Sequence, residues 1–554
     1  MASKSRIKFK EYSPSQGMLL PPSLDELISS THAVRVVSSV VDRLDLTALI
    51  STYKGGGASS YHPRMMLKVL IYAYLSNTYS SRAIEAATKE NIHFMWLAGM
   101  KRPDHNTINR FRSDRLKGVI KEVFSQVVLL LMDSGHLDMK HVYTDGTKLE
   151  ANANKYTFVW GKSIQTNKKK IKTQLEELWT YTQGVAADEL NDQGPQDFSD
   201  LDPDKVEQTI DAINQALKEK DIGPKKKQKL NYAKKNWPKN LRKYKEQERL
   251  LGERNSYSKT DVDATFMRMK DDHMNNGQLK AGYNLQWSTQ DQFILNYSLH
   301  QNPTDTLTLI PHLDQFIDQY GKLPEEVVAD AGYGSEQNYE YLNQHQIEAF
   351  VKYNYFHREQ QKSHKDKYPF RADRLYYDPH NNQYICPMGQ PMKYLGDKTV
   401  KSKAGYLSTV SRYQAVSCST CPLNGACHKS TTDRIIEVNH QLNALKALAR
   451  KKLNSEQGLI HRSKRPVDVE AAFGNLKQNK NFRRYMLRGL EKVAIETGLL
   501  AIAINLAKIA NLHRYKASKH LFQSIGKLST GFETYRISFT SIALIKSRNQ
   551  LSQI

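Results

Sequence analysis

Apolar residues recur at helical spacing through the first quarter of the chain. LDELISSTHAVRVVSSVVDRL and MLKVLIYAYLSN place them three or four residues apart, the spacing that buries one face of a helix. Ser80 and Ser81 can cap a helix that continues to Gly99, and Pro103 with Asp104 can begin the next one. The pattern predicts a helical N-terminal domain over residues 1–135.

Two helices joined by a short turn that contains glycine would form a helix-turn-helix. Amides and guanidiniums on its second helix can read base edges or phosphates, and this helix would present His105, Asn106, Asn109, Arg110 and Arg112. Plain helical packing is the alternative use of the same residues. We expect this domain to bind DNA or to support dimerisation.

The pattern changes near residue 138, where MKHVYTDGTKLEANA predicts a strand, a turn and a second strand. A polar, lysine-rich insert over residues 161–255 predicts solvated helices. Strand-like text resumes at 261 and leads into a strand–helix–strand unit that includes EEVVADAGYG. Segments 136–160 and 256–355 together predict a mixed α/β core, a sheet flanked by helices.

The remainder divides into three parts. Residues 356–440 are irregular and carry every cysteine, residues 441–514 are helical, and the tail 515–554 shows no clear pattern. The longest apolar run, 498–507, is half of the roughly 20 residues that span a membrane. It predicts a buried helix, and MASKSRIKFKEYSPSQ lacks the apolar centre of a signal peptide.

Charge and cysteine usage narrow the function classes. Lysine and arginine number 81 against 57 acidic residues, a formal charge of +24. Such a surplus favours a polyanion, because cationic side chains release counterions from phosphates; we expect nucleic acid rather than a membrane surface. Four cysteines in 554 residues do not make a disulfide framework, which favours a reducing, cytoplasmic location.

Three acidic residues lie where metal-dependent phosphoryl transfer needs carboxylates. Asp330 follows the apolar strand VVA, Asp145 lies at a similar strand-to-turn position, and Glu470 is in a helical stretch. At about 100° per residue, Lys477 and Arg484 would share the helix face of Glu470. Two Mg²⁺ ions can stabilise both oxygens of an in-line displacement, and Mg²⁺ prefers oxygen ligands.

Other residues offer alternatives or additions to this trio. Asp261 and Asp263 compete for the second acidic position, with turn and cap chemistry as their simpler use. The four cysteines, Cys386, Cys418, Cys421 and Cys427, could bind a structural Zn²⁺, with His428 able to replace one ligand, or remain free thiols. The text KYNYFHREQQKSHKDKYPFRADRLYY interleaves aromatic and basic residues, a mixture that can stack on bases and pair with phosphates or form a surface loop.

The quoted motifs resemble a bacterial insertion-sequence transposase of the DDE type, which has an RNase H-like core. The resemblance is closest to the insertion-sequence family numbered eleven eighty-two. YHPRMMLKVLIYAYLSNTYSSRAIEAATKENIHFMWLAG and PDHNTINRFR resemble that family's N-terminal domain; TDGTKLEANANKYTFVW, ADAGYGSEQNY and VEAAFGNLK resemble its catalytic segments.

The resemblance implies that Asp145, Asp330 and Glu470 bind Mg²⁺ or Mn²⁺ and carry the catalysis. In related transposases a Tyr–Arg–Glu–Lys signature surrounds the last acid. Lys477 fits the lysine of that signature, but Ser463 and Pro466 stand at the tyrosine and arginine positions. Arg465 and Arg462 are the candidates to replace the arginine. We further expect Lys148, Lys477, Arg483, Arg484 and Arg488 to contact phosphates.

The resemblance thus implies an enzyme that binds terminal inverted repeats, cuts at the element ends and joins the freed 3′-hydroxyls to target DNA. Because such an enzyme cuts two element ends, we expect a homodimer or a higher oligomer. We expect it in the bacterial cytoplasm, associated with the nucleoid. Two alternatives stay open: a metal-dependent nuclease that never joins ends, and a non-enzymatic DNA-binding protein such as a repressor or an inactive transposase.

Overall fold

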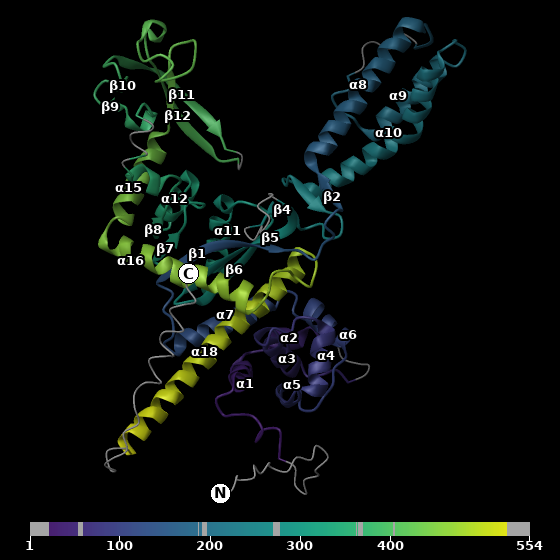
Figure 1. The fold of residues 1–554 in the computed structure, drawn as a ribbon. Helices are drawn as coiled ribbons and strands as arrows, with labels where there is room; N and C mark the ends of the chain where they lie inside the picture. Colours follow the sequence, from purple (N-terminus) through teal and green to yellow (C-terminus); the bar gives the residue numbers. More distant parts are fainter. Residues whose placement is uncertain are drawn as a thin grey trace, which may run out of the picture.

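The computed structural model describes residues 22–528, apart from 54–58, 187, 191–196, 270–277, 362, 364–368 and 403–404, with side chains described to residue 515. A mixed sheet lies at the centre, and two arms rise from it on opposite sides (Figure 1). Helices of the N-terminal region lie below the sheet, and one long C-terminal helix crosses beneath it (Figure 1). The C-terminal helix continues to Leu528, into the predicted tail 515–554, and the rest of that tail lies outside the described residues.

The central sheet has strand order β4-β5-β1-β7-β8, with β6 also paired to β5. Strand β5 is antiparallel to β1, whereas β1, β7 and β8 run parallel. This is the predicted mixed sheet flanked by helices. Its strands are β1 (His141–Glu150), β4 (Thr265–Arg268), β5 (Leu279–Gln290), β6 (Phe293–His300), β7 (Glu326–Ala329) and β8 (Glu348–Val351).

Strand β1 corrects one prediction, because no turn interrupts it at Asp145 and Gly146. Both residues pair continuously with β5, opposite Trp287 and Gln286. The glycine serves close packing instead: a side chain at position 146 would collide with the side chains of Gln286 and Asp305.

The N-terminal region is helical, as its pattern predicts. Asp104 caps α6 by accepting hydrogen bonds from the backbone of Asn106 and Thr107, at 2.9 and 3.0 Å. The predicted helix to Gly99 is broken at Asn91, whose side chain caps a separate helix. The helices are α1 (Ala33–Arg43), α2 (Thr47–Ser51), α3 (Pro63–Leu75), α4 (Ser81–Glu90), α5 (Ile92–Leu97), α6 (His105–Arg110) and α7 (Ile120–Asp133).

These helices share one hydrophobic core with the sheet and with α18 (Leu490–Leu528). Of the described helices, α18 alone is long and apolar enough to span a membrane, over Leu490–Tyr515. However, 83% of its apolar stretch is buried inside the protein, against α3, α7 and β6. It is the central helix of the core, as the apolar run predicts.

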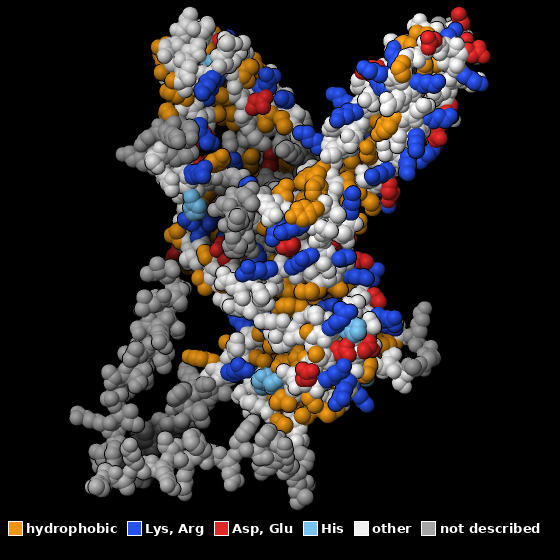
Figure 2. Space-filling model, turned by 45° about the vertical axis from the view of Figure 1, so that its right-hand side comes forward, with side chains coloured by type: hydrophobic (Ala, Val, Ile, Leu, Met, Phe, Trp, Pro, Cys, Tyr) orange, Lys and Arg blue, Asp and Glu red, His pale blue; other side chains and the backbone are white. Residues whose placement is uncertain are grey.

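The two arms have cores of their own. The first is the insert, in which α8 (Gly161–Val185), α9 (Pro203–Ala216) and α10 (Pro224–Leu251) pack around Trp179 and Trp237. A short pair, β2 (Phe158–Trp160) with β3 (Ser256–Ser258), joins this arm to the core. Lysine and arginine side chains are spread along it among acidic ones (Figure 2).

The second arm is a five-stranded antiparallel sheet rather than an irregular insert. It is held to the core by hydrogen bonds from Ser408 and Asn439 to Glu336 of α12 (Glu336–Gln344), both at 2.7 Å. Figure 2 shows the open space between the two arms. The strands are β9 (Tyr376–Asp378), β10 (Gln383–Ile385), β11 (Pro391–Lys401), β12 (Leu407–Gln414) and β13 (Ile435–Val438).

The remaining helices cover the sheet near its parallel strands. The first, α11 (Leu309–Tyr320), packs on β6, while α15 (His440–Leu453) packs on β8 and α16 (Glu456–Arg465) on β7. Beyond α16 the chain continues through a π turn, Pro466–Glu470, the short α17 (Ala471–Gly474), and a second π turn, Asn475–Asn479. Phe473 of α17 stacks on Trp287 of β5, with ring centroids 4.7 Å apart.

A buried polar network joins the N-terminal helices to α18. Arg112, only 3% exposed, donates to the Tyr74 hydroxyl at 3.1 Å and to the Tyr79 carbonyl. Tyr74 donates in turn to Glu496, which also accepts the backbone N–H groups of Met486 and Leu487. Burial raises the pKa of Glu496, and the guanidinium of Arg112 opposes that rise.

Arg112 is therefore a structural residue, and the prediction that it contacts DNA is corrected by its burial. We expect Arg112→Ala to lower the free energy of unfolding by about 3–5 kcal/mol, because it leaves Glu496 buried without its cation. Urea denaturation measures the change. Lys117→Ala, which breaks the exposed Lys117–Glu491 pair, is the control and should change stability little. An Arg112→Ala protein of full stability would contradict this assignment.

Candidate active site

Strand register brings two of the three predicted acids together. The parallel pairing of β1 with β7 ends at Thr144 and Ala329, so Asp145 and Asp330 are the next residues on neighbouring strands. Parallel strands lie about 4.8 Å apart, which places both carboxylates at one edge of the sheet. Asp145 is buried, at 5% exposure, while the side chain of Asp330 is 37% exposed.

The third acid reaches this edge from the helical segment that follows α16. Glu470 ends the first π turn, which packs against β1 and β5. The stacking of Phe473 on Trp287 holds the same segment over the face of the sheet where Asp145 lies opposite Trp287. Glu470 therefore faces the two aspartates, with half of its side chain exposed.

One guanidinium contacts all three carboxylates. Arg465 Nη2 lies 3.0 Å from Asp145 Oδ2 and 3.8 Å from Asp330 Oδ2, and Nη1 lies 2.8 Å from Glu470 Oε1. The Arg465 side chain is only 8% exposed. Three acids far apart in the chain thus converge on a single cation.

The π turn explains how Arg465 comes to occupy this place. An arginine four residues before a glutamate lies on the same face of an α-helix, but Pro466 stands there. Arg465 is five residues before Glu470, and a π turn follows an i to i+5 pattern. The wider turn therefore restores the arginine to the face of the acid.

The acids line a hollow of about 470 Å³ together with Lys477 and Arg483. The rest of its lining includes Gly474 and Gln478. The hollow is open to solvent on the side of Asp330 and Glu470, whose side chains are the exposed ones. It therefore offers clustered oxygen ligands beside cations that can hold a phosphate.

This donor set fits a hard divalent cation, which takes carboxylate oxygens. Among the described residues, no three His, Cys, Asp or Glu side chains are already gathered as ligands of one ion. The reason is visible at the trio: its carboxylates surround the larger guanidinium of Arg465. Arg465 Nε is buried and has no partner among the described atoms, so this guanidinium is incompletely satisfied where it lies.

Two sequence families match the chain. A transposase domain matches residues 22–114, and a transposase DDE domain matches residues 385–510, the part that carries Arg465, Glu470 and Lys477. The chain carries a transposase DDE domain, and with it the enzyme type of a DDE transposase. It is thus a polynucleotidyl transferase, of a class that binds DNA and generally uses a divalent metal. No curated protein matches the sequence.

On the face of the sheet opposite to the Asp145 side chain, the transposase has a row of polar residues, where Gln286 and Asn284 pair with Gly146 and Lys148. Asp305 accepts hydrogen bonds from Asn284 and Gln286 at 2.7 and 2.9 Å, and the Tyr333 hydroxyl donates to Gln286. Burial, then the charges of Asp305, Asp145 and Asp330, raise the pKa of Tyr333 well above its usual value. Tyr333 therefore stays protonated and remains a donor beneath the site.

The predicted phosphate contacts separate into two groups. Lys477 and Arg483 line the hollow of the acids. Lys148 lies three residues beyond Asp145 on β1, so strand alternation places it on the other face, opposite Asn284. The structure does not bring Lys148 to the hollow.

Arg484 corrects the prediction of one continuous cationic helix face. The helical segment ends at Asn479, and Arg484 forms an isolated bridge with Glu150. Its guanidinium donates to the Ala153 carbonyl at 3.1 Å, and Arg488 donates to the Asn152 carbonyl at 2.8 Å. Both arginines therefore lie on an irregular segment between the second π turn and α18.

That segment ends at a second hollow, of about 500 Å³, on the N-terminal helices. This hollow is lined by three of the residues predicted to contact DNA, His105, Asn106 and Asn109. It is also lined by the cations Arg82, Arg488 and Lys492. His105 is paired with Glu85 at 2.7 Å, and Arg110 is exposed outside the hollow. Apart from Arg112, the residues predicted for DNA contact are thus accessible.

Asp261 and Asp263, the competitors for the second acidic position, hold the beginning of α18. Asp261 accepts from the Tyr283 hydroxyl and from the Gly489 backbone, and Asp263 accepts from the Leu490 backbone at 2.8 Å. Their role is structural, and Asp330 is the acid that faces Asp145.

The cysteines do not form a metal-binding group. All four are free thiols, and none takes part in a cluster of three or more potential ligands within the described residues. Cys418 is buried in the second arm, and Cys427 Sγ accepts from Arg434 at 2.9 Å. Cys386 and Cys418 pack in the core of this arm, so of the two predicted alternatives the structure favours free thiols over a Zn²⁺ site.

Sequence reasoning missed Lys352, and it named Arg465 only as a substitute. Lys352 follows β8, whose last pair is Val351 with Ala329, so it extends the row of Asp145 and Asp330 by one strand. The apolar run IEAFV before Lys352 predicts a buried strand. Because the ends of parallel strands meet at one edge of a sheet, it also predicts that Lys352 lies near Asp330.

We expect Arg465→Met to destabilise the metal-free transposase by about 1.5–3 kcal/mol, through the loss of charged hydrogen bonds. In this variant no guanidinium competes with Mn²⁺ for the three carboxylates. Mn²⁺ should therefore raise its thermal unfolding midpoint more than that of the wild type. Differential scanning calorimetry measures both effects. Arg462→Met is the matched control, since Arg462 bonds to Leu453 and Asn454 instead. Equal Mn²⁺ shifts in wild type and Arg465→Met would contradict the assignment.

Proposed function

We propose that this protein is the transposase of a bacterial insertion sequence, of the family numbered eleven eighty-two. It binds the terminal inverted repeats, cuts phosphodiester bonds at the element ends and joins the freed 3′-hydroxyls to target DNA. The observation that carries the proposal is the convergence of Asp145, Asp330 and Glu470 on the guanidinium of Arg465.

Asp145, Asp330 and Glu470 would hold Mg²⁺ or Mn²⁺. When bound, a pair of such ions supplies charge stabilisation for the attacking and leaving oxygens of an in-line displacement. The chain's own residues position the DNA: Lys477 and Arg483 lie in the same hollow and hold the phosphates that flank the reacting bond. Once displaced from the carboxylates, Arg465 is available to a phosphate as well, because its guanidinium matches phosphate oxygens.

The same residues suggest a path for the duplex. Arg483, Arg484 and Arg488 follow one another from the acids toward the hollow on the N-terminal helices. The inverted repeat would lie along this path, with Asn106 and Asn109 facing its bases and Arg110 facing its backbone. Two copies of the chain, one for each element end, would form a dimer or higher oligomer, located with the bacterial nucleoid in the cytoplasm.

The proposal predicts that Asp330→Asn and Glu470→Gln lower cleavage of DNA carrying the gene's flanking ends by at least about a hundredfold. Loss of a ligand should cost more than the 10–100-fold typical of a residue that only orients one. Binding of the same DNA should change little, because Lys477 and Arg483 remain. Cleavage is measured on gels with Mg²⁺ or EDTA, and binding by fluorescence anisotropy.

Glu491→Gln is the control, because Glu491 is an exposed acid paired with Lys117; it should cut like the wild type. Metal-dependent cleavage retained by Asp330→Asn would remove Asp330 from the reaction. Cleavage without joined products would favour a nuclease, and binding without cleavage in Mg²⁺ or Mn²⁺ would favour a non-enzymatic DNA-binding role.

A further inference from the structure

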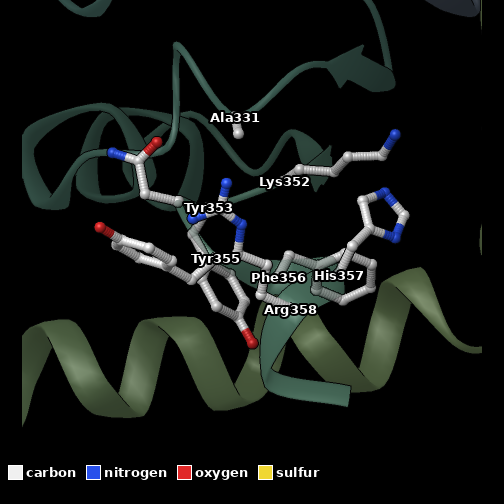
Figure 3. Close-up of a pocket in the computed structure, with 8 residues that line it drawn as sticks. Ala331, Lys352, Tyr353, Tyr355, Phe356, His357 and Arg358 are labelled. Atoms are coloured by element: carbon white, nitrogen blue, oxygen red, sulfur yellow. The ribbon is translucent and has the colours of Figure 1, made fainter. Parts of the chain in front are cut away.

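A third hollow, of about 560 Å³, adjoins the acids on the side of β8. Ala331, the residue after Asp330, forms one wall, and the chain from Lys352 to Arg358 forms the others (Figure 3). Gly334 fixes this arrangement, because a side chain there would collide with the backbone of Lys352 and Tyr353. The hollow is therefore built into the strand row that carries Asp145 and Asp330.

The floor of the hollow is aromatic and firmly packed. Phe356 is buried in the core, and the Tyr353 hydroxyl accepts from Arg450 at 2.8 Å and donates to Glu359 at 3.0 Å. These rings provide a rigid base for the residues between them. Helices α15 and α16 support it from below (Figure 3).

Tyr355 is the exposed ring of this segment, at 50% exposure. Its φ of 72° is left-handed, a conformation that a bulky residue rarely adopts and that costs free energy. The guanidiniums of Arg358 and Arg371 lie 5.6 and 5.5 Å from the ring centre. An aromatic residue in a rarely adopted backbone conformation is thus held out of the core, with two cations near its ring.

The lining is cationic, and none of its residues carries a carboxylate. Lys352 and His357 extend to the same side of the hollow (Figure 3). Burial, then the charges of Arg465 and Arg462, lower the pKa of Lys352, while Asp330 and Glu470 oppose the change. Burial and the Lys352 charge lower the pKa of His357 as well, so this imidazole is neutral at pH 7. The hollow thus offers two cations and a neutral hydrogen-bonding ring.

We propose that this hollow binds one unstacked nucleotide of the DNA strand next to the phosphodiester bond that is cut. Its base stacks on Tyr355 and its phosphate contacts Lys352 and Arg358. An aromatic face beside cations is the chemistry that binds single-stranded nucleotides, and the volume falls within the range of about 300–1,000 Å³ for small-ligand sites. The inference rests on the proposed function, because Ala331, which lines this hollow, directly follows Asp330, the acid that would face the reacting bond.

The position explains why such a site would serve the reaction. An enzyme that takes a base out of the stack loses stacking and pairing free energy, and stacking on a protein ring offsets part of that loss. Binding of this nucleotide at Tyr355 would fix the position of the DNA strand. The phosphate to be cut would then lie beside Asp330 and the other carboxylates. Tyr355 is therefore a positioning residue.

The test uses the full-length protein and duplexes that carry the gene's flanking ends. 2-Aminopurine replaces, one at a time, the bases within three nucleotides of the cut, and Ca²⁺ replaces Mg²⁺ so that DNA binds without being cut. We expect the fluorescence of one position to change on binding, because that base leaves the stack. Tyr355→Ala should abolish the change and weaken binding about tenfold, the scale of one base–aromatic stack, whereas Tyr355→Phe should retain both.

Tyr376→Ala is the matched control, because Tyr376 is an exposed tyrosine of the neighbouring arm, at 69% exposure; it should behave like the wild type. Wild type that cuts in Mg²⁺ but gives no position-specific signal, or Tyr355→Ala that equals wild type in signal and affinity, would overturn the inference and leave the proposed function standing. Wild type that neither binds nor cuts these ends would overturn both.

Discussion

Three carboxylates and one guanidinium at a single sheet edge set the main constraint on this structure. Like charges this close repel one another, and the repulsion grows as water is excluded. The register of β1 against β7 fixes Asp145 beside Asp330, and the π turn adds Glu470 from above. Arg465 neutralises part of this charge, so the metal-free protein can hold the acids together.

The rest of the molecule is arranged so that this edge stays open. One arm is inserted between β2 and β3 and the other between β8 and α15, and each has a core of its own, so neither arm is packed into the hollow of the acids. The N-terminal helices instead share the central core. Through Tyr74 and Arg112 they bond to Glu496, which also holds the backbone at Met486 and Leu487. The segment that carries Arg483 to Arg488 is thus anchored to the N-terminal helices.

Hydrophobic patterning predicted the helical N-terminal region, the mixed sheet and the strand before Asp330, because burial leaves a direct trace in sequence. It failed at Gly146, where a glycine that indicates a turn instead allows Gln286 and Asp305 to approach. A regular 100° periodicity could not reveal the π turns, which change the register of the helix, or its end before Arg484. The arginine at 112 carries no mark of burial in the sequence, since only the tertiary fold supplies Tyr74 and Glu496 as its partners.

The account depends on a divalent cation at Asp145, Asp330 and Glu470. The most direct measurement replaces that cation with Fe²⁺, adds ascorbate and peroxide, and maps where locally generated hydroxyl radicals cut the polypeptide. We predict fragments that end near residues 145, 330 and 470, suppressed by excess Mg²⁺, from one full-length protein. Cuts confined to other parts of the chain, or cuts at these positions that Mg²⁺ does not suppress, would contradict the assignment of these three carboxylates as the metal site.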